Sequence, residues 1–191
     1  RWETPHLEGF NRATAPGFYW PKEIVTAYDA HGEQERRFPQ KDGESGVDWE
    51  RRTAEAGHVE NQVKLGWRHR EGRGVEASDK LAVAWFRRAV ATDDPPAMDH
   101  LGWMLREGRG CERDDEEAVS LFQRAAEARH HQARFNLGLM LRDGRGVEAP
   151  DTLGALTWLG RAARVGHKGA TAAFDELVAT ARVPLHELMK E

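Results

Sequence analysis

The stretch EGRGVEASD, at residues 71–79, decides the fold because the chain repeats it twice in nearly the same form. EGRGCERDD follows at residues 107–115 and DGRGVEAPD at residues 143–151, so that successive copies lie 36 residues apart. A fixed period of this length is typical of a supersecondary unit that stacks on copies of itself. The sequence therefore predicts a repeat protein.

A helix is predicted to lead into each of these glycine loops. Small or polar residues precede a leucine-glycine pair by four positions, and another residue follows on the same face four positions later, which is helical spacing. At a helix C-terminus the chain often needs left-handed backbone, which glycine adopts without cost. The residues predicted to end the three helices are Gly72, Gly108 and Gly144.

A second helix is predicted after each loop, because Ser78, Asp114 and Asp151 have side-chain oxygens suited to an N-cap. Positions 4, 7, 8 and 11 after each cap are small or apolar and form one face of an amphipathic helix. In the first copy, the residues expected to be buried on this face are Ala82, Trp85, Phe86 and Ala89.

The repeat pattern extends beyond the three clear copies. The same frame moved back by 36 residues predicts Asp42 as the cap of a degenerate earlier helix. The frame moved forward predicts one more first-type helix, from Gly166 to about Ala181. We expect about four helix-pair repeats over residues 42–183, followed by a polar C-terminal tail at residues 184–191.

Residues 1–41 do not fit the repeat. Three consecutive aromatic side chains stand behind a Pro-Gly pair in the segment APGFYW, and they are Phe18, Tyr19 and Trp20. Because the terminal units of a repeat stack need special surfaces, one interpretation is an N-terminal cap that covers the end of the stack. The alternative is an arm that binds a partner.

The recurring pattern A-x-x-x-L-G, G-x-G-V and A-x-x-W-F-x-x-A-A resembles the Sel1-like repeat, a relative of the tetratricopeptide repeat, over most of the chain. This resemblance implies an all-α fold, a right-handed α/α solenoid. It also implies that the protein is an adaptor, such as an inhibitor, an immunity-type protein or a bacterial envelope-signalling protein, because members of the family are rarely catalysts. A tyrosine common in the first helix of that family is His69, Leu105 and Leu141 here, so its contacts are not carried over.

Composition narrows the function classes further. Lys and Arg number 28 against 32 Asp and Glu, so the formal net charge is −4, which disfavours nucleic-acid binding. Apolar runs are far shorter than the roughly 20 residues that cross a bilayer. The first ten residues lack an initiator Met and the apolar stretch of a signal peptide, which predicts a trimmed or processed chain. The sequence does not distinguish a cytoplasmic from a periplasmic location.

The glycine loops and the single cysteine could suggest chemical sites, but a structural role explains both better. The glycine loops lack the lysine and hydroxyl of a phosphate-binding loop. Cys111, the one cysteine, stands where the other copies have Val75 and Val147, and is expected to be an apolar plug without catalytic function.

Three histidines, His58, His130 and His167, share one position at the start of a first-type helix, and Asp94 holds that position in the remaining copy. Equivalent sites on stacked helices lie on the order of 10 Å apart, too far for one metal ion to bridge. We therefore expect a role at the helix start, and neither a metal nor a cofactor.

Arginines recur in two rows, Arg70, Arg106 and Arg142 in the first and Arg73, Arg109 and Arg145 in the second. Acidic residues recur near both rows, so the arginines are expected to form weak ion pairs between repeats or to line a groove. The first helices of helix-pair solenoids generally line the concave side, and Trp and Arg are enriched in binding hot spots. The candidate groove residues are Val63, Trp67, Arg70, Asp99, Trp103, Arg106, Phe135, Leu139 and Arg142.

We therefore predict a non-catalytic scaffold that binds a partner protein or peptide on its concave face, with an extended acidic segment as the expected ligand. The alternative is a hydrolytic enzyme that uses His and acidic residues in the solenoid or in the N-terminal arm. No nucleophile and base stand at a workable spacing in the sequence, which favours the scaffold.

Overall fold

The computed structural model describes residues 39–181, and this part of the chain is all-α, without strands. The predictions for Phe18, Tyr19, Trp20 and the tail at residues 184–191 lie outside the described residues. The helices are α2 (Gly46–Glu55), α3 (Val59–Glu71), α4 (Asp79–Val90), α5 (Pro95–Glu107), α6 (Asp115–Glu127), α7 (His131–Asp143), α8 (Thr152–Ala163) and α9 (Lys168–Ala181).

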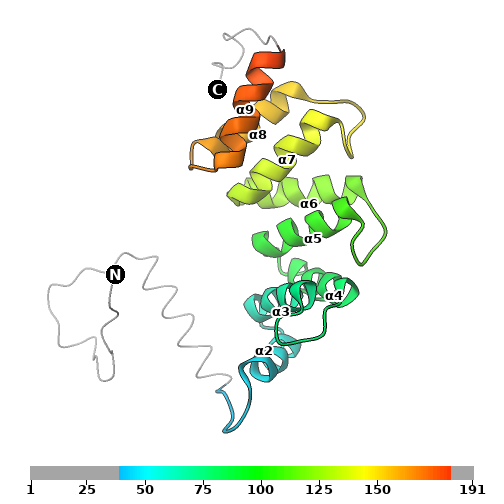
Figure 1. Cartoon of the computed structure of the whole chain (residues 1–191), viewed down its shortest axis with the longest axis vertical. Helices are drawn as coiled ribbons and strands as arrows, with labels where there is room; N and C mark the ends of the chain where they lie inside the picture. The colour runs from blue at the N-terminus through cyan, green and yellow to red at the C-terminus, as the bar shows by residue number, and fades with distance from the viewer. Residues whose placement is uncertain (1–38, 182–191) are drawn as a thin grey trace, which may run out of the picture. The chain divides into compact units, whose positions relative to one another are not determined.

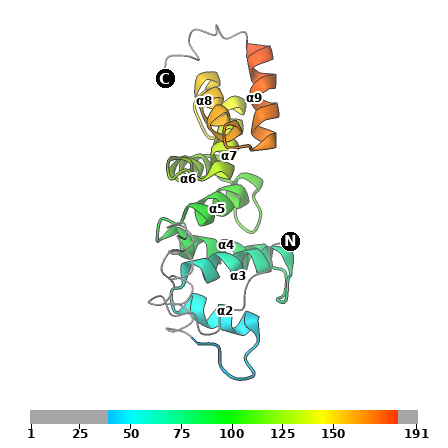
Figure 2. The same ribbon diagram turned by 90° about the vertical axis from the view of Figure 1, so that its left-hand side faces the viewer.

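These helices belong to one compact unit, Glu44–Glu191, in which each helix packs against its neighbours in the chain. Figures 1 and 2 show them following one another in chain order from α2 to α9. The first helices of the pairs are α3, α5, α7 and α9, here termed A-helices, and α2, α4, α6 and α8 are B-helices. The predicted solenoid of helix pairs is confirmed, and its right-handed sense stays a prediction.

The loop glycines end the A-helices as predicted. Gly72, Gly108 and Gly144 are C-caps in the left-handed region, with φ of 69°, 64° and 65°. The second glycine of the loop has a further role. A Cβ on Gly146 would overlap the carbonyl oxygen of Asp115 in the preceding repeat, so the loop approaches the N-terminus of α6 closely. The glycines thus serve both helix termination and contact between repeats.

The B-helix caps are also confirmed, because Ser78, Asp114 and Asp151 accept from backbone N–H groups three residues ahead. The prediction of Asp42 as the earlier cap is wrong. Ser45 caps α2 and accepts from the Asp48 N–H at 3.1 Å. Ser45 lies three residues later than Asp42 and adjoins the first residue of the helix, so its hydroxyl reaches the free N–H groups.

The histidines at the A-helix starts have the predicted structural role. The Nδ1 atoms of His58 and His130 accept from backbone N–H groups at 3.3 Å, and Nδ1 of His167 does so at 3.0 Å. Asp94 accepts in the same way in α5, at 2.9 Å. An imidazole nitrogen therefore replaces the oxygen that usually caps a helix.

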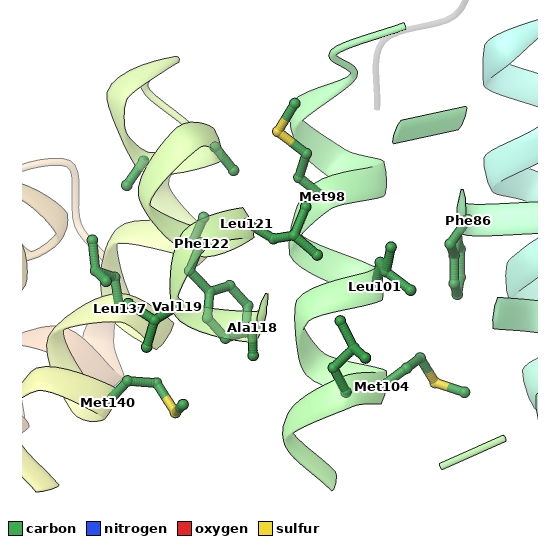
Figure 3. Close-up of a cluster of buried hydrophobic side chains, with 14 of the residues drawn as sticks. Phe86, Met98, Leu101, Met104, Ala118, Val119, Leu121, Phe122, Leu137 and Met140 are labelled. Atoms are coloured by element: carbon green, nitrogen blue, oxygen red, sulfur yellow. The ribbon is translucent and has the colours of Figure 1, made fainter. Parts of the chain in front are cut away.

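The larger core cluster runs through α4, α5, α6 and α7, and a second cluster joins α8 to α9. Phe86 of α4 and Phe122 of α6 have no exposed surface, and Figure 3 shows them with apolar residues of α5 and α7. A Cβ on Gly66 would overlap the Phe86 ring, and one on Gly102 would overlap the Phe122 ring. The leucine-glycine pairs therefore give these rings space to lie against the A-helices.

The prediction that Trp85 belongs to this core is wrong. Its side chain is only half-buried, and the Arg88 guanidinium lies over its ring, 4.8 Å from the centroid. The equivalent Leu121 of α6 is buried, at 4% exposure. The position lies at the edge of the apolar face, where leucine fits completely but the longer indole extends to the surface.

Cys111→Val is expected to change the free energy of unfolding by less than about 0.5 kcal/mol, since the position is only partly buried and holds valine in the other two repeats. Cys111 packs half-buried against the core, as Val147 does in the next repeat, and burial raises the pKa of the thiol. Urea denaturation of both proteins measures the difference. A loss above about 2 kcal/mol would contradict the packing role.

Candidate functional site

An open pocket of about 430 Å³ lies on the face formed by the A-helices α3, α5 and α7. We term it the A-helix groove. Seven of the predicted groove residues line it: Trp67, Arg70, Asp99, Trp103, Arg106, Phe135 and Leu139. The remaining lining residues are His100, Gln132 and Asn136.

Two predicted groove residues lie outside this pocket. Val63 lines an adjoining hollow that also includes Trp67 and Arg68. Arg142 lies near the C-terminus of α7, where its Nε donates to Asp143 at 2.7 Å. The stripe of residues is therefore continuous along three A-helices, and its middle section is concave enough to form a pocket.

The two tryptophans of the groove form cation–π contacts with arginines. The Arg70 guanidinium lies 3.6 Å from the Trp67 ring centroid and 5.3 Å from that of Trp103. Arg109, from the loop after α5, lies 5.3 Å from the Trp103 centroid. Such cation–π contacts orient both indoles while leaving them partly exposed.

His100 links the first two A-helices. Its Nε2 accepts from the indole Nε1 of Trp67 at 2.7 Å, and the rings meet edge to face. Burial, together with the positive charge of Arg70, lowers the pKa of His100 to about 4. The imidazole is therefore neutral at pH 7, as its acceptor role requires.

Asp99 and Asn136 link the second and third A-helices. The Asn136 amide donates to Asp99 Oδ1 at 2.8 Å, and both side chains are buried, at 5% and 3% exposure. Burial raises the pKa of Asp99 to about 6, and the hydrogen bond from Asn136 and the charge of Arg106 oppose this rise. The groove floor thus holds a carboxyl group that is costly to ionise.

The two arginine rows differ in their partners. One interpretation expected ion pairs between repeats, but in the first row Arg70 and Arg106 form ion pairs with the adjacent Glu71 and Glu107 of their own repeats. In the second row, Arg73 also pairs within its own repeat, with Glu71, but the other two arginines form ion pairs between repeats. The sequence did not indicate the carboxylates of these pairs, which come from the N-termini of α4 and α6: Arg109 pairs with Asp79 and Arg145 with Asp115, both at 2.8 Å.

Sequence reasoning missed His100, Gln132 and Asn136. His100 and Asn136 occupy one repeat position, which Lys64 holds in the first copy. A polar residue recurs at this position in all three copies, directly beside the apolar stripe, and this recurrence could have indicated that the position lines the groove. For Gln132, whose Oε1 lies 3.0 Å from His167 Nε2, the other copies offer no comparable signal.

No group of three or more His, Cys, Asp or Glu side chains in residues 39–181 is placed to hold a metal ion. Within the same residues, the helices are too short or too polar to cross a bilayer.

Comparison with known families agrees with this repeat geometry. The Sel1 repeat model matches residues 62–91, 95–130 and 131–167, which span most of α3 through α8. The chain belongs to the Sel1 repeat family. Proteins of this family are commonly protein–protein interaction scaffolds. In this Sel1 repeat chain, each matched segment contributes one of the A-helices that line the groove.

Solved structures are similar to this Sel1 repeat chain. A Sel1 repeat protein from Oxalobacter formigenes superposes with a TM-score of 0.60 and 34% identity, over 66% of this chain and 95% of its own. The protective antigen c5321 of uropathogenic Escherichia coli, which has an SLR fold, superposes with a TM-score of 0.64 and 29% sequence identity over 80% of this chain. The chain spans only 35% of that antigen.

Helicobacter pylori cysteine rich protein B shares the fold at 16% identity, with a TM-score of 0.53 over 69% of this chain and 98% of its own. In sequence, no curated protein matches this Sel1 repeat chain.

Proposed function

We propose that the chain is a non-catalytic scaffold that binds an extended segment of a partner protein in the A-helix groove. The observation that carries this proposal is the joining of apolar and cationic side chains from three successive repeats in one open pocket. The apolar surface comes from Trp67, Trp103, Phe135 and Leu139, all partly exposed. Partly exposed aromatic side chains beside arginines are typical of binding hot spots.

The charge of the groove favours an acidic partner. The side chains of Arg70 and Arg106 are 19% and 17% exposed, and each is held near its tryptophan or its glutamate rather than extended into solvent. Arginines fixed in this way lose little freedom on binding, and guanidinium groups form strong paired hydrogen bonds with carboxylates. An acidic side chain of the partner can thus bind at low entropic cost.

The spacing of the repeats suits an extended ligand. Equivalent residues on successive A-helices lie on the order of 10 Å apart, and an extended peptide advances about 3.3 Å per residue. Acidic side chains three residues apart therefore match Arg70 and Arg106, and an apolar residue between them reaches Trp103. The partner segment is inferred to be extended, acidic and interrupted by apolar residues.

The contacts of the groove histidine and aspartate support binding over hydrolysis. The His100 Nε2 atom, the natural proton acceptor, is already bonded to the Trp67 indole. The buried Asp99 carboxyl is bonded to Asn136. Neither group is directed at a hydroxyl or thiol that could act as a nucleophile in the contacts of the described residues.

Trp103→Ala is expected to weaken binding of an acidic peptide by more than about tenfold, which corresponds to roughly 1.4 kcal/mol. Arg106→Ala is expected to weaken it comparably, because it removes a charge-assisted hydrogen bond. The probes are labelled nine-residue peptides with glutamate at every third position and leucine between, measured by fluorescence anisotropy. Peptides with lysine in place of glutamate serve as ligand controls.

Arg88→Ala is the matched protein control, because Arg88 lies on α4 and contacts Trp85 rather than the groove. Circular dichroism confirms that each variant folds. If both groove variants bind as tightly as the wild type, the groove is not the site, and the N-terminal segment at residues 18–20 becomes the next candidate. Equal binding of the lysine peptides would contradict the acidic specificity.

A further inference from the structure

The floor of the A-helix groove holds polar groups that the contacts of its arginines and tryptophans leave unused. Asp99 of α5 and Asn136 of α7 line this pocket, and one hydrogen bond of 2.8 Å joins their side chains. We propose that this pair is a subsite that binds the side-chain amide of an asparagine or glutamine in the partner segment. This subsite rests on the proposed function, since its ligand is one residue of the segment that the groove binds.

Asp99 stands at a repeat position that otherwise holds apolar residues. The equivalent residues of the first and third copies are Val63 and Phe135, 36 residues before and after it. An apolar side chain has no charge to bury at this position, whereas the Asp99 carboxyl is only 3% exposed and burial raises its pKa to about 6. Departures from a structural pattern that cost stability are expected at functional sites. The aspartate is therefore better explained by binding than by packing.

One oxygen of Asp99 is left open to the groove. Its Oδ1 accepts from the Asn136 amide, and its Oδ2 has no hydrogen-bond partner among the described residues. Within the same residues, the only side-chain polar atom that is both enclosed and without a partner is Gln62 Oε1. The Oδ2 atom is therefore not enclosed by protein, and it must reach the open space of the pocket that Asp99 lines.

Asn136 offers a second acceptor beside the first. Because its Nδ2 donates to Asp99, its Oδ1 remains free to accept. This oxygen also has no partner in residues 39–181 and is not enclosed, although the side chain as a whole is only 5% exposed. The NH₂ group of a carboxamide has two N–H donors. It can therefore bond to both oxygens of the hydrogen-bonded pair.

His100 supplies a donor for the other end of an amide. Its Nε2 accepts from the Trp67 indole, so the neutral ring carries its proton on Nδ1. This N–H donates to no atom of the described residues, and His100 lines the same pocket as Asp99. The carbonyl oxygen of a carboxamide can accept from it. The groove floor thus combines acceptors with a donor, which is the combination that an amide requires.

An amide fits this subsite better than a charged group does. A lysine ammonium could donate to Asp99, but it has no acceptor for the His100 N–H. The positive charges of Arg70 and Arg106, which line the same pocket, would also repel it. A carboxylate has no donor for the open oxygen of Asp99, and the two negative charges would repel each other. A neutral amide avoids both conflicts.

The decisive variant is Asp99→Asn, which keeps an acceptor for Asn136 but places an N–H donor where Oδ2 stood. The probes are the labelled acidic peptides, with each central leucine replaced in turn by glutamine, glutamate or methionine, measured by fluorescence anisotropy against the full chain at pH 7.5. In the wild type, glutamine at one of these positions is expected to bind at least about tenfold more tightly than methionine. In Asp99→Asn, the ratio of glutamine affinity to glutamate affinity should fall at least about tenfold.

Asp93→Asn is the matched protein control, because it makes the same chemical change in the turn before α5, outside the pocket. We expect it to keep the wild-type ratio of affinities, and circular dichroism confirms that both variants fold. An unchanged ratio in folded Asp99→Asn would overturn the subsite, as would a wild type that binds glutamine and methionine peptides equally. In both cases binding of the acidic peptides themselves still supports the groove. Failure of every peptide to bind would contradict the groove and the subsite together.

Discussion

Phe86→Ala is expected to lower the free energy of unfolding by about 3–5 kcal/mol, the usual cost of removing a buried phenyl ring. Phe86 has no exposed surface, and its ring fills the space over Gly66 of α3. The ring also lies 5.3 Å from the His100 ring of α5, measured between centroids. The substitution therefore leaves a cavity where three helices meet, and urea denaturation measures its cost.

Trp85→Ala is the matched control for this prediction, because it removes a larger ring from the adjacent residue of the same helix. Trp85 is half-buried and covered by Arg88, so we expect a loss of about 1–2 kcal/mol. Equal losses in the two variants would show that the wrong face of α4 has been assigned to the core. A small loss for Phe86→Ala would show the same.

The parts of the fold that the sequence predicts are those determined locally. The left-handed C-cap at Gly108 and the N-cap at Asp114 depend on a few adjacent residues, and the period of 36 makes each signal appear three times. Asp42 and Ser45 show where this reasoning fails. Two good capping residues stand three positions apart, and only the position of the first helical turn decides between them.

Burial depth is harder to predict because it depends on packing between helices. Trp85 and Leu121 share one repeat position, yet leucine is buried and tryptophan reaches the surface. Helical periodicity identifies the face on which both residues lie. It does not determine how far that face extends under the neighbouring helix, which varies with side-chain length.

The candidate groove was predicted in outline because its residues follow one stripe of the A-helices. The polar contacts across the groove were not predicted, because each joins different repeat positions. Trp67 bonds to His100, and Asn136 bonds to Asp99. These pairs lie 33 and 37 residues apart, so neither follows the period of 36 on which the sequence comparison depends.

Asp99→Asn is expected to raise the free energy of unfolding at pH 7 by up to about 3 kcal/mol. Burial raises the pKa of Asp99 from its ordinary value of 3.8 to about 6, so the folded protein ionises this group at a cost. A pKa difference of about two corresponds to roughly 3 kcal/mol. Asparagine keeps an oxygen that can accept from Asn136 without carrying the charge.

This effect has a definite direction with pH. Because the pKa of Asp99 is higher in the folded state, the wild type loses stability from this group as pH rises from about 4 to 6. The advantage of Asp99→Asn should therefore be complete above about pH 6 and vanish below about pH 4. His100 acts oppositely, since its pKa falls to about 4 on folding and its protonation destabilises the fold in acid.

The difference between wild type and Asp99→Asn isolates Asp99, because the ionisation of His100 is present in both proteins and cancels to first order. Urea denaturation at intervals between pH 4 and pH 7.5 therefore gives a curve that reports one carboxyl group. Thermal denaturation under the same conditions checks that both proteins unfold in one step. A difference that stays constant across this pH range would mean that Asp99 does not change its ionisation there, and that burial in the groove floor does not raise its pKa.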